Sequence, residues 1–122
     1  MSNKALGSYG ELLAKKYLVS QGYRILEENF RTKMGEIDLI AKDGQTICFI
    51  EVKARQSLQQ GTPLEAIHSW KMKKLTQLAL FYLKVKFRSV DIQARFDVVS
   101  IVQKPDAKPE IRLIKNAFDS VY

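Results

Sequence analysis

The chain of 122 residues contains a single cysteine, Cys48, and a single histidine, His68. A disulfide scaffold needs paired cysteines and a Cys/His zinc module needs several ligands, so both classes are excluded. Proline and glycine are scarce as well, with 3 and 6 residues, and no low-complexity linker divides the sequence. We therefore expect one domain over residues 1–122.

Long apolar runs are also missing. Lys4 is not followed by the apolar stretch of a signal peptide, and no segment approaches the roughly 18 apolar residues of a membrane helix. The composition, 46% hydrophobic and 27% charged, is that of a globular protein with a buried core. We expect no membrane association and a cytoplasmic location, which the lone cysteine also favours.

The net charge of +7 is unevenly distributed. Residues 1–55 hold 9 basic and 7 acidic side chains, residues 56–95 hold 7 and 2, and residues 96–122 hold 4 and 4, so the excess runs +2, +5 and 0. A localised basic segment is typical of a surface that meets a polyanion such as nucleic acid. The alternative is a solvated lysine-rich helix.

Apolar spacing and turn residues predict elements in the order α-β-β-β-α-β-β. They are a helix over 4–21, strands over 23–30, 36–42 and 46–55, a helix from 62 to about 87, and strands over 95–102 and 110–114. Thr62, Pro63 and Glu65 mark the start of the second helix, and Ser69 is another candidate start, so one helix or two remain open. The order predicts an α/β fold in which helices flank a mixed β-sheet.

The pair Asp43-Gly44 predicts a two-residue hairpin loop, so that the numbers of paired residues sum to 87. Asp38 then lies across from Phe49 and diagonal to Glu51. Opposed residues share a face of the sheet. One face carries Glu36, Asp38, Glu51, Lys53 and Arg55 beside Ile40, Ile47 and Phe49; the other carries Ile37, Leu39, Ala41, Cys48, Ile50, Val52 and Ala54 and is the expected core.

The carboxylates of Asp38 and Glu51 are close enough in this arrangement to converge on one ion. Their backbones would lie about 7–8 Å apart, and their mutual repulsion would be about 2 kcal/mol at a dielectric near 20. Lys53 or a bound cation is needed to compensate, and oxygen ligands without a His or Cys cluster favour Mg²⁺ or Mn²⁺. Such a site suits phosphodiester hydrolysis. The alternative is a solvent-facing strand of alternating Glu and Lys.

This hairpin resembles the active-site hairpin of the PD-(D/E)XK nuclease superfamily in two segments, GEIDLIA at 35–41 and FIEVKAR at 49–55. More closely, the whole chain is similar to the YraN-like family of small bacterial proteins. The likeness also includes Gly10-Glu11, Gly22-Tyr23 with Ile25, Leu26 and Asn29, the run Arg95-Phe96-Asp97-Val98-Val99, and Asn116-Ala117-Phe118.

The resemblance implies a restriction-endonuclease-like fold, closest in plan to archaeal Holliday-junction resolvases. Asp38 and Glu51 take the places of the metal-binding carboxylates, and Lys53 takes that of the motif lysine. Ile37 stands where the motif has proline, which removes no metal ligand. Glu11 matches a further metal ligand of the resolvase branch and borders the apolar stripe of its helix; its alternative is an exposed pair with Lys15.

The basic segment supplies the expected nucleic-acid contacts, Arg55 on the hairpin and Lys71 and Lys74 on the second helix. Lys71 shares a helical row with apolar residues, so it either extends past the sheet edge or faces the active-site cleft, which we favour. We interpret Trp70 and Tyr82 as packing residues. An exposed Trp70 beside Lys71 would instead favour base stacking.

Together these patterns predict a DNA-binding, Mg²⁺- or Mn²⁺-dependent endonuclease that acts on branched or otherwise structured DNA. Two alternatives stay open: a binding module that keeps the fold without turnover, and an adaptor whose basic helix docks an acidic protein. Junction-type enzymes often act as dimers, so the resemblance leaves a homodimer open, although no segment marks an interface.

Overall fold

The computed structural model describes residues 2–56 and 69–118. Its elements are α1 (Asn3–Ser20), β1 (Arg24–Thr32), β2 (Gly35–Asp43), β3 (Thr46–Arg55), α2 (Ser69–Phe87), β4 (Ala94–Val102) and β5 (Glu110–Phe118). The predicted order and the α/β class are confirmed. The predicted helix start at Thr62, Pro63 and Glu65 lies outside the described residues.

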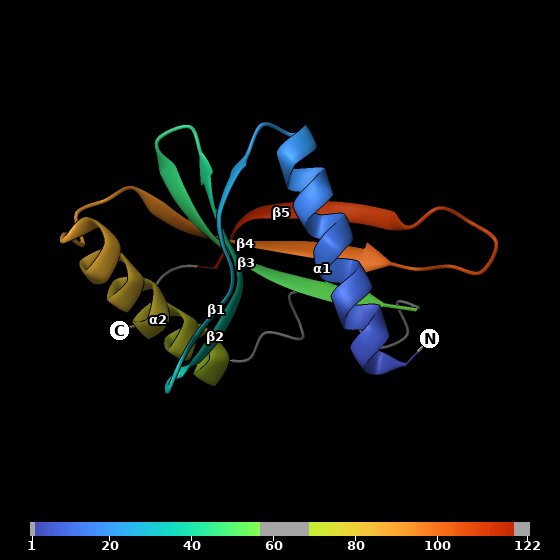
Figure 1. The fold of residues 1–122 in the computed structure, drawn as a ribbon, viewed down its shortest axis with the longest axis horizontal. Helices are drawn as coiled ribbons and strands as arrows, with labels where there is room; N and C mark the ends of the chain where they lie inside the picture. The colour runs from blue at the N-terminus through green and yellow to red at the C-terminus, as the bar shows by residue number, and fades with distance from the viewer. Residues whose placement is uncertain (1, 57–68, 119–122) are drawn as a thin grey trace.

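The five strands form one mixed sheet in the order β1-β2-β3-β4-β5. Neighbouring strands are antiparallel except β3 and β4, which run parallel and are joined by the crossover that contains α2. The sheet twists strongly, and the two helices lie well apart with strands between them (Figure 1). No helix within the described ranges has the length and apolar content needed to cross a membrane.

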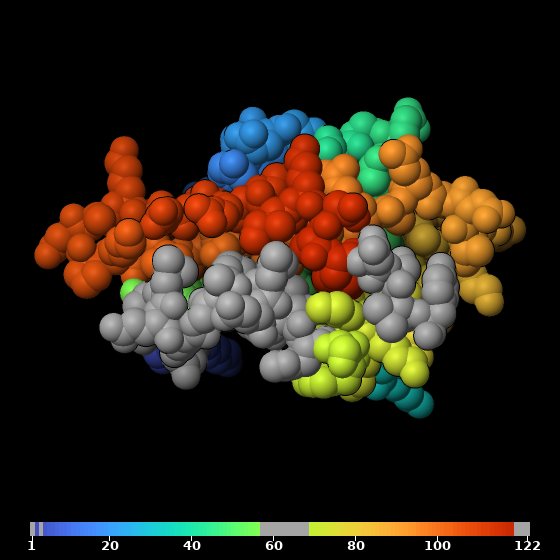
Figure 2. Space-filling view, turned by 180° about the vertical axis from the view of Figure 1, so that it is seen from behind, coloured from blue at the N-terminus to red at the C-terminus, as the bar shows by residue number. Residues whose placement is uncertain are grey.

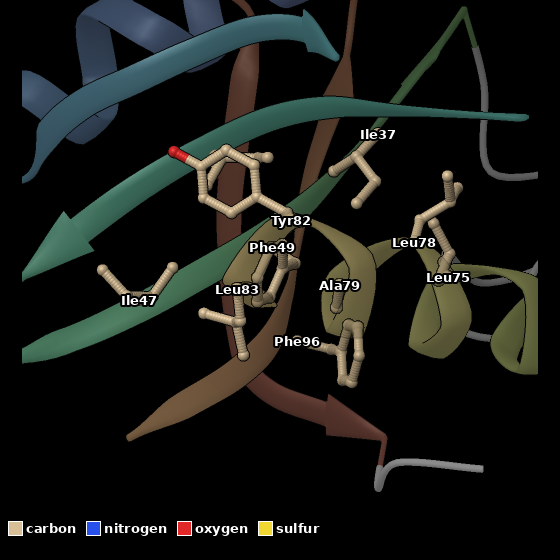
Figure 3. Close-up of a cluster of buried hydrophobic side chains, with 10 residues drawn as sticks. Ile37, Ile47, Phe49, Leu75, Leu78, Ala79, Tyr82, Leu83 and Phe96 are labelled. Atoms are coloured by element: carbon tan, nitrogen blue, oxygen red, sulfur yellow. The ribbon is translucent and has the colours of Figure 1, made fainter. Parts of the chain in front are cut away.

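Two apolar clusters pack the sheet on both faces, one under each helix. The α1 cluster consists of Ala14, Leu18, Tyr23, Leu39, Ala41, Cys48, Ile50, Val99 and Ile101. The α2 cluster consists of Ile37, Ile40, Ile47, Phe49, Leu75, Leu78, Ala79, Tyr82, Leu83 and Phe96 (Figure 3). The face on which we expected the charged residues is therefore covered by α2 near the hairpin loop.

The residue Ile37 is buried in the α2 cluster and not, as predicted, with Leu39 in the α1 cluster. Pairing between β2 and β3 runs from Asp43 to Leu39. Ile37 lies beyond that pairing, so its side chain does not have to follow the pleat of the hairpin. The neighbouring strand β1 is irregular at the same place. Its residue Asn29 has a φ of 51° and lies between Glu28 and Phe30, which pair with Leu39 and Ile37.

The first helix crosses β3 at very short range. Its N-terminus is capped by the Ser2 side chain, which accepts a hydrogen bond of 3.1 Å from the Ala5 N–H, and Gly22 follows the helix with φ 93°. A Cβ on Gly10 would stand 2.5 Å from the Cβ of Ala54. Glycine is therefore required at this crossing, which holds α1 against the strand that bears Glu51 and Lys53.

The register of the central hairpin differs from the prediction by two residues. Asp43 pairs with Thr46 and Leu39 with Ile50, so paired numbers sum to 89 and the loop is Gly44-Gln45, with Gly44 at φ 61°. Asp43 stays in the strand because its carboxylate binds Arg95 of β4 at 2.8 Å. Within the paired part of the hairpin, a shift of two leaves each residue on its predicted face, since side chains alternate with a period of two; Ile37 lies beyond that part.

The last strand is four residues longer than the predicted strand over 110–114 and continues to Phe118. Asn116 has φ 52°, which interrupts the alternation. Its backbone N–H donates to the Asp97 carboxylate at 2.9 Å, and Phe118 pairs with Phe96 across a register shift. A side chain of β4 thus holds the end of β5, a long-range contact that local pattern does not reveal.

A buried ion-pair network surrounds that contact. The Asp97 side chain is fully buried and accepts hydrogen bonds of 3.0 and 3.1 Å from Arg95 Nε. Arg95 also donates to Tyr23 Oη at 2.7 Å and to Asp43 at 2.8 Å. The Arg95–Asp97 ion pair thus links three strands, β2, β4 and β5, with Tyr23, which lies between α1 and β1. Cys48 is buried beside it, and burial raises the pKa of the thiol to about 12.

Candidate active site

The two strands of the hairpin separate at Asp38. Beyond the Leu39–Ile50 pair, the N–H of Val52 donates to Asp38 Oδ2 at 2.8 Å. The side chain thereby replaces the backbone carbonyl that a continuing ladder would have supplied. This contact satisfies the backbone donor, fixes the carboxylate, and leaves an opening between the strands.

The carboxylate of Glu51 lies across that opening. Asp38 directly precedes Leu39, and Glu51 directly follows Ile50, so the two carboxylates flank the last pair of the β2–β3 ladder. Glu51 is 5% exposed. A buried carboxylate needs a cationic partner, because an uncompensated charge in the interior is costly.

Two lysines supply the positive charge. Lys71 Nζ of α2 lies 2.7 Å from Glu51 Oε2, and Lys53 Nζ of β3 lies 3.9 Å from the same oxygen. Both lysines are partly buried. The predicted position of Lys71, directed into the site and not past the sheet edge, is confirmed by this ion pair.

These groups line a cleft of about 350 Å³ between the β1–β2 turn, the separated strands and the first turns of α2. Its charged lining residues are Glu36, Asp38, Glu51, Lys53, Lys71 and Lys74, and its remaining lining residues include Met34, Val52, Trp70, Leu75 and Leu78. A larger hollow of about 730 Å³ lies beside the β4–β5 loop. Among its described lining residues, the one carboxylate is that of Asp106.

The cleft shifts the pKa values of three of its charged groups. Burial, and after it the charge of Glu51, raises the pKa of the Asp38 carboxyl to about 7, although the Val52 hydrogen bond acts in the opposite direction. Burial also lowers the pKa of Lys53, and the neighbouring Lys71 ammonium adds to this. For Lys71 burial acts to lower the pKa, but the hydrogen bond to Glu51 together with the charges of Glu51 and Asp38 outweighs it, so the pKa is raised. Shifts of opposite kinds within one cleft are typical of catalytic sites.

The predicted ligand Glu11 lies near the cleft but does not line it. Burial raises its pKa, the side chain of Asn29 lowers it through a hydrogen bond, and the charge of Glu36 raises it. The alternative pair with Lys15 is not formed, since Lys15 binds Glu28 at 3.2 Å. Glu11 is thus close enough to Glu36 for the charge of that residue to affect its pKa.

Of the remaining residues with a predicted role, some line the cleft and others do not. Lys74 lines the cleft, whereas Arg55 is partly buried at the end of β3, beyond the lining residues. The packing prediction is confirmed for Tyr82, which is 3% exposed, and wrong for Trp70, which is 62% exposed. In the predicted register Glu36 pairs with Glu51. In the structure Glu36 lies beyond the paired part of β2 and β3, where it lines the cleft and binds Arg31 at 2.8 Å.

Comparison with known proteins agrees with the resemblance seen in the sequence. The profile of the uncharacterised protein family UPF0102 matches residues 10–101. The chain belongs to this family. It is 48% identical over 122 residues to a UPF0102 protein of Geobacter metallireducens, covering 100% of this chain and 98% of that one. It is 46% identical over 120 residues to one of Geotalea uraniireducens, covering 98% and 94%, and 46% identical over 117 residues to one of Clostridium kluyveri, covering 95% of each. The predicted membership of the YraN-like family is confirmed.

The donor set of this UPF0102 site fits a magnesium-type ion. Within residues 2–56 and 69–118, no three or more His, Cys, Asp or Glu side chains are arranged so that together they could hold a metal ion. Mg²⁺ keeps several of its waters and is commonly bound by one or two carboxylates together with substrate phosphates, whereas Ca²⁺ and Zn²⁺ need a fuller protein cage. Asp38 and Glu51 are the two carboxylates of the cleft that would hold such an ion, with Glu11 close by.

Two features of this cleft do not follow from the sequence patterns. One is the contact of Val52 with Asp38, because it depends on where the strands separate. The other is the participation of Met34 in the β1–β2 turn and of Trp70 in the first turn of α2, which meet at the cleft. The position of Trp70 could be predicted in part, since Trp70 directly precedes Lys71, which we expect in the cleft.

Proposed function

We propose that the protein is a metal-dependent nuclease that hydrolyses phosphodiester bonds in DNA. The observation that carries the proposal is the convergence of Asp38, Glu51, Lys53 and Lys71 in one cleft. Carboxylates for a hard cation beside ammonium groups for a phosphate are the combination that phosphodiester hydrolysis requires. The resemblance to the PD-(D/E)XK hairpin supports the same reaction and adds structured DNA as the substrate.

In this proposal Asp38 and Glu51 hold Mg²⁺ or Mn²⁺, with Glu11 as an additional group. The ion supplies Lewis-acid chemistry at the phosphate when bound. Lys53 orients the attacking water and offers positive charge to the phosphate, and its lowered pKa makes proton transfer at Nζ easier. Lys71 and Lys74 bind the phosphate chain, and Arg55 extends this surface along β3. A protein that acts on DNA would work in the bacterial cytoplasm, where the DNA lies.

A cleavage assay tests the proposal. Linear, flapped and four-way DNA are incubated with the protein in Mg²⁺ or in EDTA, and the Asp38→Asn and Lys53→Met variants are compared with Lys104→Met, a matched change at an exposed lysine. We expect Mg²⁺-dependent cleavage that the two cleft variants lose by at least about a hundredfold and the control retains. Equal cleavage by all four proteins would refute the assignment of these residues.

A non-catalytic nucleic-acid-binding module is the second candidate. It is favoured by one observation, that two ammonium groups of the protein, those of Lys71 and Lys53, pair with the Glu51 carboxylate. A module of this kind would bind DNA with a salt-dependent affinity and would show no requirement for Asp38. Undiminished DNA binding by Asp38→Asn together with absent cleavage by the parent protein would select it.

A further inference from the structure

Trp70 is the most exposed of the large hydrophobic side chains among the described residues, at 62%. It occupies the second position of α2, directly before the lysine that binds Glu51. The first turn of α2, yellow-green in Figure 2, lies at the surface with the teal β1–β2 turn close to it. An indole ring is rarely left in water without a partner, because its burial is strongly favourable.

The ring stands at the rim of the cleft described above. Trp70 lines that cleft together with Met34 of the β1–β2 turn, which is 40% exposed. The rim is thus formed by an aromatic ring on one element and a thioether on another. The same cleft holds the Asp38 carboxylate of β2, the buried Glu51 and the Lys53 ammonium of β3, and the Lys71 ammonium of α2.

A cation is associated with the same ring. Lys74 Nζ lies 5.8 Å from the centre of the Trp70 ring, one helical turn further along α2. A flat aromatic ring with an ammonium group beside it matches a nucleotide, in which a flat base is joined to a phosphate. A protein-docking aromatic would be flanked mainly by apolar side chains, whereas Lys71, Lys73 and Lys74 follow Trp70 in the sequence.

We propose that Trp70 stacks on an unpaired nucleobase, with Lys74 on its phosphate, so that the site takes a single-stranded segment next to the scissile bond. This inference rests on the proposed function for the direction of the strand into the cleft. A base in a continuous duplex has both faces stacked and cannot offer one to the indole ring. The site would therefore prefer flaps, gaps and the unpaired bases at branch points to intact duplex.

The chain contains one tryptophan, so its fluorescence reports on Trp70 alone. The Asp38→Asn protein, which keeps DNA intact, is titrated with oligothymidylate, with an abasic oligomer of the same length and charge, and with a duplex. We expect strong quenching by oligothymidylate and little by the abasic oligomer or the duplex. Equal quenching by the abasic oligomer would overturn the proposal, because phosphate contact alone would then explain the signal.

Affinity is measured in parallel by the anisotropy of a labelled oligothymidylate. Trp70→Ala should bind about tenfold more weakly and Trp70→Phe should bind nearly as tightly as the parent, since stacking survives in phenylalanine. Phe81→Ala is the matched control, as Phe81 is 42% exposed on the same helix, about 16 Å along its axis. Unchanged binding by Trp70→Ala, in a protein with the parent's circular dichroism, would refute the inference.

The two proposals fail separately. Base-dependent quenching without any Mg²⁺-dependent cleavage by the wild-type protein would remove the nuclease and keep the single-strand site. Cleavage without base-dependent quenching would remove the stacking site and keep the nuclease. If neither DNA nor RNA oligomers quench Trp70, the exposed ring serves another kind of partner and the inference is wrong.

Discussion

Lys71 Nζ lies 2.7 Å from Glu51 Oε2, so an ammonium of the protein itself stands against the carboxylate that we assign to a metal ion. The contact joins α2 to β3 across the cleft and balances a charge that is almost fully buried. It also means that a divalent cation at Glu51 has to compete with Lys71. The same lysine would be free to meet a phosphate once the ion has bound.

Replacement of Lys71 should therefore have opposite effects on the two ligands. In Lys71→Met the competing ammonium is gone, so we expect Mn²⁺ to bind about tenfold more tightly, which corresponds to about 1.4 kcal/mol. DNA affinity should fall, because a phosphate contact is lost. Calorimetry with Mn²⁺ and anisotropy with labelled DNA measure the two effects, and Lys73→Met on the exposed side of α2 is the control. A decrease in Mn²⁺ affinity would contradict the competition.

The pH dependence of stability should reflect Asp38. Its pKa is about 7 in the folded protein against 3.8 as an ordinary aspartate, so the folded state binds the proton more tightly than the unfolded state. Stability from this group is complete below the lower value and decreases as pH rises through about 7. Urea unfolding in EDTA should show this decrease in the wild type and a smaller one in Asp38→Asn. Identical pH profiles would show that Asp38 is ionised without penalty.

The contact between α1 and β3 predicts a sharp difference between two glycines of one helix. Gly10→Ala puts a methyl group 2.5 Å from Ala54 Cβ, whereas Gly7→Ala meets nothing within 4 Å. We expect the first to lose about 1–3 kcal/mol of unfolding free energy through overpacking and the second to gain up to about 1 kcal/mol through helix propensity. Denaturant titrations of the two variants should separate in sign.

The buried network predicts a large cost for losing Arg95. In Arg95→Met the fully buried Asp97 carboxylate keeps the Asn116 N–H but loses its cation. The expected loss is about 3–5 kcal/mol of unfolding free energy. Lys104→Met, which removes an exposed pair with Glu110, should cost at most about 1 kcal/mol. Comparable losses in both variants would mean that the Asp97 network contributes little.

Local pattern was sufficient for much of the fold. The bounds of β3 were predicted to the residue from the β-rich run and the Asp-Gly turn, and the α-β-β-β-α-β-β order followed from turn residues and periodicity. The assignment of Asp38, Glu51 and Lys53 to one end of the hairpin survived a register error of two residues, because a shift of two preserves the face of a side chain wherever the strand alternates regularly. Ile37, beyond the last β2–β3 pair, is the exception.

The errors arose where a distant residue decides the local structure. Arg95 holds Asp43 in the strand and moves the hairpin loop by one position, and Asp97 holds Asn116 and lengthens β5. The placement of Trp70 at the rim likewise depends on how α2 meets the β1–β2 turn. None of these contacts lies within the span of sequence that periodicity can address.

The central claim is that Asp38 and Glu51 form the divalent-cation site of a basic cleft, and calorimetric titration with Mn²⁺ tests it most directly. We predict saturable binding by the wild-type protein, a loss of that binding in both Asp38→Asn and Glu51→Gln, and retention in Lys104→Met. Binding that is unchanged in the two carboxylate variants, or absent from the wild type even with uncleavable DNA present, would contradict the account.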